Sequence, residues 1–102
     1  MPVLAVRIPH SLPQEEATDR VRRWMDGMIA RYPSYSESVS VTWAEHRAKF
    51  SGSTAFASAS GTLVVETAEV VVHVELPFLA GTFKSQIKSF IVRALTDELA
   101  AG

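Results

Sequence analysis

The residues of this sequence best suited to chemistry near neutral pH are three histidines, His10, His46 and His73. His10 stands between Pro9 and Pro13, where a strand-like segment gives way to a helical one. An imidazole placed there could act as a general base or bind a ligand. The sequence offers it no recognisable partner acid or nucleophile, so we favour a structural role in which His10 bonds backbone groups or caps the helix. His46 is predicted at a turn, with no functional role.

Two pairs of ionisable residues could also support chemistry. His73 and Glu75 share the outer face of a predicted strand, but a transition-metal site needs three or four ligands. Glu66 and Glu69 are expected to face each other at a hairpin end, where solvated carboxylates discourage aggregation of sheet edges. We therefore predict no metal, no cofactor and no catalytic residue.

Composition narrows the class of protein. The chain has 102 residues, 47% of them hydrophobic, a net charge of −1 and no cysteine, which predicts one folded α+β domain over residues 1–102. The balanced charge argues against nucleic acid as a partner, and no apolar run is long enough for a transmembrane segment. Nucleotide-binding, zinc-protease and serine-hydrolase motifs are absent from the sequence. We expect a cytoplasmic protein, with a non-enzymatic role favoured over an enzyme.

The first third of the chain predicts a strand and a helix. Residues 3–8 alternate in the manner of a strand. Ser11 and Gln14 have the spacing of a helix capping box, and Pro33 should follow the end of the helix. Apolar residues at steps of three and four form one stripe: Ala17, Val21, Trp24, Met25, Met28 and Tyr32.

Residues 38–76 change to a period of two, which predicts two hairpins. A two-residue turn at 45–46 would pair Val41 with Phe50, and another at 67–68 would pair Leu63 with Val72. Residues 79–99 then carry a second helical stripe. The predicted fold is a single antiparallel sheet of about five strands, in the order β-α-β-β-β-β-α, with both helices on one face. This is a reduced version of the helix-grip fold, in which a curved sheet wraps a long C-terminal helix.

Aromatic residues and the outer sheet face suggest two kinds of contact. Six aromatic residues could line a cavity for an apolar ligand, although aromatics at such spacing more often form plain core: Trp24, Trp43, Phe50, Phe78, Phe83 and Phe90. Trp43, Phe50 and Phe90, together with His10, are the candidate ligand-binding residues. The outer face of the sheet is less polar than a fully solvated face, so a homodimer through it is a further hypothesis.

Several segments together resemble a known family. They are IPHSL (8–12), Glu16-Ala17, Trp43 with Phe50 seven places later, Gly61, and VVHVELPFLAGTFKSQI (71–87). This pattern is similar to the small polyhydroxyalkanoic acid system proteins, described also as a polyhydroxyalkanoate granule-associated region. The resemblance covers nearly the whole chain and implies a link to storage-polyester metabolism or its granules, without a catalytic residue to carry over.

Three functions follow as expectations. The first is an accessory, non-enzymatic protein of the polyhydroxyalkanoate system that contacts the granule surface, with Phe78, Leu79 and Phe83 as candidate contacts. The alternative is a binder of a small apolar molecule, such as an acyl chain, held between sheet and C-terminal helix. The third is an enzyme that uses His10 as a base.

Overall fold

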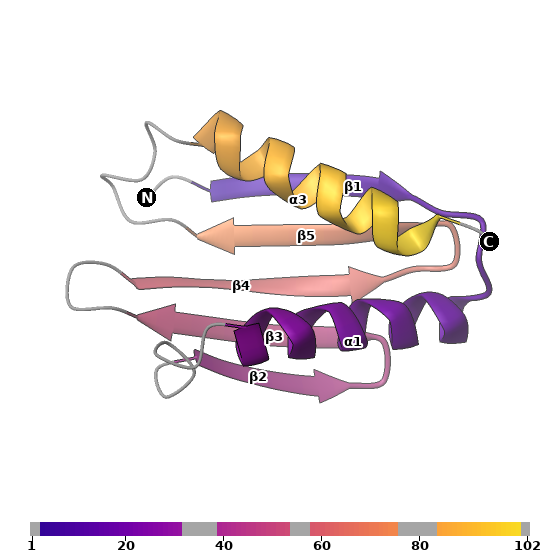
Figure 1. The fold of residues 1–102 in the computed structure, drawn as a ribbon, viewed down its shortest axis with the longest axis horizontal. Coiled ribbons are helices and arrows are strands. Elements are labelled where there is room, and N and C mark those ends of the chain that lie inside the picture. Colours follow the sequence, from indigo (N-terminus) through magenta and orange to yellow (C-terminus); the bar gives the residue numbers. More distant parts are fainter. Residues whose placement is uncertain (1–2, 32–38, 54–57, 76–83, 101–102) are drawn as a thin grey trace.

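The computed structural model describes residues 3–31, 39–53, 58–75 and 84–100 (Figure 1). Its elements follow the predicted order β-α-β-β-β-β-α. They are β1 (Val3–Pro9), α1 (Gln14–Arg31), β2 (Val39–Ala44), β3 (Arg47–Ser53), β4 (Ser58–Val65), β5 (Glu69–Glu75) and α3 (Lys84–Leu99).

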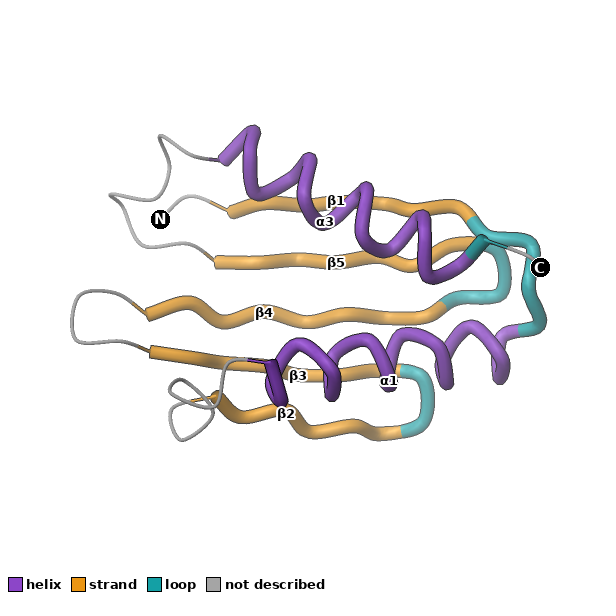
Figure 2. The backbone as a smooth tube through the Cα atoms, in the orientation of Figure 1, coloured by secondary structure: helices purple, strands orange, loops and turns teal. Residues whose placement is uncertain are grey.

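The strands form one antiparallel sheet in the order β1-β5-β4-β3-β2. The first strand thus pairs with the last strand of the chain, and β4 is central. Both helices lie on the same face of this sheet (Figure 2), with α3 packed on β1 and α1 on β4. The predicted α+β class and the placement of both helices on one face are confirmed.

Both predicted hairpin registers are also confirmed. Val41 is paired with Phe50 in the first hairpin and Leu63 with Val72 in the second. Each register places apolar side chains on the helix-covered face, and a slip by one residue would turn all of them to solvent.

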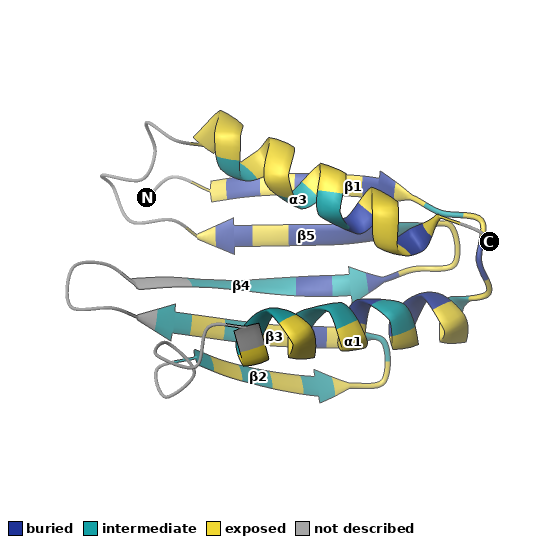
Figure 3. Ribbon diagram, viewed as in Figure 1, coloured by how far each residue is buried: buried dark blue, intermediate teal, exposed yellow. Residues whose placement is uncertain are grey.

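The core is densely packed at one end of the molecule and loosely packed at the other. Near its start, α1 buries Ala17 and Val21 completely, and near its end α3 buries Leu95 and Leu99. These four residues lie together because the helices are antiparallel on the sheet (Figure 3). The apolar residues at the opposite ends of the two helices are at most partly buried: Trp24, Met25, Met28, Ile29, Ile87, Phe90 and Ile91.

The start of α1 differs from the prediction. The helix begins at Gln14, and the Pro13 carbonyl accepts a hydrogen bond of 2.9 Å from the Ala17 amide. The Gln14 side chain does not bond back to Ser11; its Nε2 donates to the Val65 carbonyl at 2.8 Å. Within the described residues no hydrogen bond joins Ser11 and Gln14, so the capping-box prediction is wrong; the Gln14 side chain instead fastens the helix to the end of β4.

The turn between β2 and β3 carries a residue in an unfavourable conformation. Glu45 has φ of 55°, a left-handed conformation that glycine adopts without steric cost. We expect Glu45→Gly to raise the free energy of unfolding by about 0.5–1 kcal/mol, measured by urea denaturation. Thr67→Gly, in the second hairpin turn, should instead lower it, because Thr67 does not have positive φ. Equal effects of the two substitutions would contradict this explanation.

Candidate functional site

An apolar groove of about 420 Å³ lies between the two helices and the sheet, at the loosely packed end of the core. Its lining comes from both helices and four strands: Trp24, Met25, Met28, Ile29, Val39, Val41, Phe50, Ser51, Gly52, Leu63, Val72, Val74, Ile87, Phe90, Ile91 and Leu95. Among these described residues there is no Asp, Glu, His, Lys or Arg. Such a surface can bind apolar groups by excluding water, and it has no acid or base for proton transfer.

Several lining residues are suited to contact with a ligand. Phe90 is 52% exposed, although it lies on the helix stripe that the sequence assigns to the core. Covering such a ring would remove apolar surface from water. Met25 and Met28, both partly buried, have flexible unbranched side chains that adapt to irregular shapes.

The structure brings together part of the residue set that the sequence suggests. Phe50 and Phe90 both line the groove, whereas Trp43 does not. The Trp43 ring lies under Arg22, with the guanidinium carbon 5.0 Å from the ring centroid, in cation–π geometry. Its indole Nε1 is buried and has no hydrogen-bond partner within the described part of the chain. The three candidate granule contacts, Phe78, Leu79 and Phe83, lie outside the described residues.

His10 lies at the other end of the sheet, away from the groove. Its Nδ1 accepts a hydrogen bond of 3.2 Å from the Leu12 amide, so Nε2 carries the proton and donates to the Glu66 carbonyl at 2.9 Å. The His10 amide donates to the Ala68 carbonyl, also at 2.9 Å. Both ring nitrogens are thus engaged in joining the start of α1 to the β4–β5 turn.

His46 takes part in a second polar contact with α1, which the sequence did not reveal. The buried Thr18 hydroxyl donates to the Gln14 carbonyl at 2.8 Å, so the His46 Nδ1, 2.9 Å away, must be the donor to Thr18 Oγ1. The His46 Nε2 is 3.4 Å from Glu15 Oε1. His46 therefore fastens the β2–β3 turn to the first turns of the helix.

The remaining ionisable pairs do not form a metal site. Glu69 forms an ion pair with Arg7 and is only partly exposed, which corrects the prediction of two solvated carboxylates at this hairpin end. His73 and Glu75 lie on the outer face of β5. Within the described residues, no three His, Cys, Asp or Glu side chains gather closely enough to hold a metal ion.

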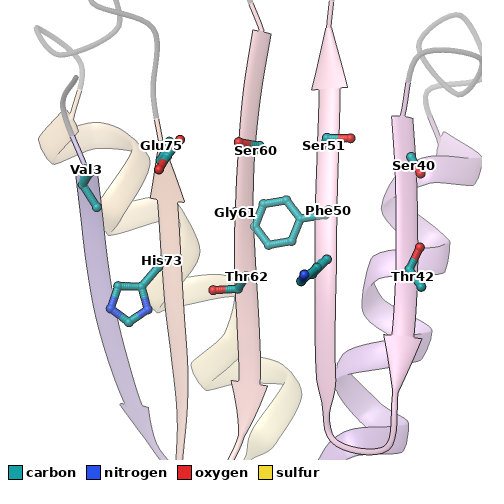
Figure 4. A pocket seen from close by; sticks show the side chains of 11 residues that line it. Val3, Ser40, Thr42, Phe50, Ser51, Ser60, Gly61, Thr62, His73 and Glu75 are labelled. Atoms are coloured by element: carbon teal, nitrogen blue, oxygen red, sulfur yellow. The ribbon is translucent and has the colours of Figure 1, made fainter.

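The outer face of the sheet has a depression of its own, of about 630 Å³ (Figure 4). Phe50 also contributes to this lining, and its ring lies across Gly61, the residue paired with it on β4. A Cβ atom at Gly61 would be 2.2 Å from the His73 carbonyl oxygen and 2.8 Å from Phe50 Cζ. Gly61 is therefore required for the close approach of this ring and the neighbouring backbone.

The two glycines Gly61 and Gly27 give a test of that conclusion with one type of substitution. Gly61→Ala should lower the free energy of unfolding by about 1–3 kcal/mol, because the backbone must shift. Gly27→Ala, in the exposed middle of α1 with nothing within 4 Å, should raise it by about 0.5–1 kcal/mol. Urea denaturation of both variants measures the difference, and a stable Gly61→Ala protein would contradict the packing described here.

A structural role for His10 has its own test. His10→Ala leaves the Leu12 amide and the Glu66 carbonyl without their partner and should lower the free energy of unfolding by about 1–3 kcal/mol. Ser11→Ala, at the exposed neighbouring position, should change it by less than about 0.5 kcal/mol. If His10→Ala is as stable as Ser11→Ala, these hydrogen bonds contribute nothing to folding.

Fold and groove together define a small α+β protein with an apolar cleft between its helices and one antiparallel sheet. The family model described as "Putative polyhydroxyalkanoic acid system protein (PHA_gran_rgn)" matches residues 4–99. The chain belongs to this family, as its resemblance indicated.

A comparison with solved structures bears on the fold. The structure is similar to the crystal structure of TTHA0849 from Thermus thermophilus, with a TM-score of 0.55 and 15% sequence identity over 96% of this chain and 94% of the other. At this identity the likeness shows a shared fold.

No curated protein matches the sequence significantly. Among the described residues, neither helix is both long and apolar enough to cross a lipid bilayer.

Proposed function

We propose that this protein is a non-enzymatic accessory protein of the polyhydroxyalkanoate system that binds apolar acyl chains in the groove between its helices and sheet. The observation that carries the proposal is the groove itself, about 420 Å³ in volume and lined by apolar side chains. Membership of the family supplies the metabolic context, since a polyhydroxyalkanoic acid is a polyester of hydroxyacyl units.

The chemistry of the lining favours binding over catalysis. Acyl transfer or hydrolysis needs a positioned base or nucleophile. Ser51 is the hydroxyl residue among the described groove residues, and its side chain lies on the outer face of the sheet (Figure 4). An acyl chain would replace water against Trp24, Ile91 and Phe90, while its polar end would stay at the open side of the groove.

Tryptophan fluorescence offers a direct assay. The chain has two tryptophans, so Trp43→Phe leaves Trp24, in the groove, as the reporter. We expect saturable fluorescence changes with methyl 3-hydroxydecanoate as the probe. In the converse variant, Trp24→Phe, the remaining Trp43 lies outside the groove lining and should respond much less.

Binding should depend on Phe90 in a predictable way. Phe90→Ser removes an aromatic contact that is 52% exposed before binding, so the variant should remain folded and bind the probe about tenfold more weakly. Val92→Ser is the matched control, because Val92 is exposed on the same helix and does not line the groove. Titration of both in the Trp43→Phe background measures the effect. Equal affinities for the two variants would locate binding elsewhere.

The same variants separate a free ligand from the polyester surface. In a sedimentation assay with polyhydroxybutyrate granules, the protein should pellet with the granules. If the groove makes the contact, a smaller fraction of Phe90→Ser than of Val92→Ser should pellet. If granule binding is unchanged by Phe90→Ser but falls in Phe78→Ser or Leu79→Ser, the surface contact is the segment originally suggested by the sequence. A protein that neither sediments nor binds the probe would overturn the proposal.

A further inference from the structure

The outer face of the sheet is not covered by any described element and presents ordered rows of side chains (Figure 4). Because neighbouring strands are paired in register, residues on this face line up across all five strands. One row is Ser40, Ser51, Ser60, Glu75 and Val3, and the next is Thr42, Lys49, Thr62, His73 and Ala5. The depression of about 630 Å³ is formed along these two rows.

On this face, the basic and the acidic side chains lie on different strands. The outward residues of β4, at the centre of the sheet, are uncharged: Ser60, Thr62 and Val64. On one side of β4, the outward side chains of β3 include the basic residues Arg47 and Lys49. On the other side, β5 presents Glu75 and also Glu69, which is already paired with Arg7 on the neighbouring strand β1. The basic and the acidic strand are thus placed symmetrically about a neutral one.

We propose that this face binds a second copy of the chain, with a two-fold axis in the interface and parallel to β4. Such a rotation places β4 of one copy over β4 of the other. A charged residue on this strand would then face a like charge, whereas the outward residues of β4 are uncharged. It places β3 of one copy over β5 of the other, so Lys49, which is in the same row as His73, lies over His73 of the partner subunit. From there its long side chain extends one row along the strand, toward the partner's Glu75. The contact therefore occurs twice in the dimer, once on each side of the axis.

The size of the face is sufficient for this role. Five strands spaced about 4.8 Å apart and seven residues long, the length of β1, β3 and β5, cover about 550 Å² per copy. The total of about 1,100 Å² exceeds the roughly 1,000 Å² typical of the smallest specific interfaces. Exposed Val3 and the small residues of β4 allow the two sheets to approach closely. This interface is independent of the groove, which lies on the other face.

Charge reversal tests the proposal. Light scattering and sedimentation equilibrium at low salt should show a mass rising with concentration from the monomer's 11.2 kDa toward twice that value. Lys49→Glu and Glu75→Lys should each weaken dimerisation at least about tenfold, because each places two pairs of like charges across the interface. The double variant, which exchanges the two charges, should return the dimerisation constant to within about threefold of the original protein.

Lys88→Glu is the control, since it makes the same charge change on the exposed surface of α3. It should leave dimerisation unchanged. A protein that remains monomeric at every concentration overturns the proposal. So does a dimer that is insensitive to both single reversals, or one that the double variant fails to restore, since each result would place the contact outside the Lys49–Glu75 pairing.

Discussion

The polar attachment of α1 at its first turns is the constraint on which the rest of the structure depends. Gln14 bonds the end of β4, and His46 bonds Thr18 from the β2–β3 turn. Arg20 donates to the carbonyls of Glu98 and Ala100, at 3.2 and 2.9 Å, and so joins the start of α1 to the end of α3. These bonds fix both helices at one end of the sheet, where the core is dense. The other ends of the helices are free of such bonds among the described residues, and there the groove opens.

This division explains why an 18-residue amphipathic helix does not pack uniformly. A closely packed core would place Trp24 and Met28 at full burial, since burial of each large apolar side chain is favourable by about 1.5–3 kcal/mol. In this protein both remain partly exposed, along with Phe90 on the facing helix. The apolar surface of these side chains is left open to the groove at this end of the sheet.

The sequence predicted those features that depend on local pattern. Alternation of apolar residues determined the hairpin registers of Val41 with Phe50 and Leu63 with Val72, because a one-residue slip would expose the core face. Helical spacing identified the stripe that contains Phe90. Such spacing shows which face of the helix is directed toward the sheet, but it does not show how closely the helix packs on the sheet. The pairing of His46 with Thr18 joins residues 28 positions apart, and no local signal marks such a contact.

Phe50 connects the two faces of the molecule. Among the described residues it lines both the groove and the outer depression, and its ring lies close to Gly61, the residue paired with it on β4. The close approach at Gly61 thus places one paired position, Phe50 with Gly61, in the lining of the outer depression, while Phe50 also lines the groove.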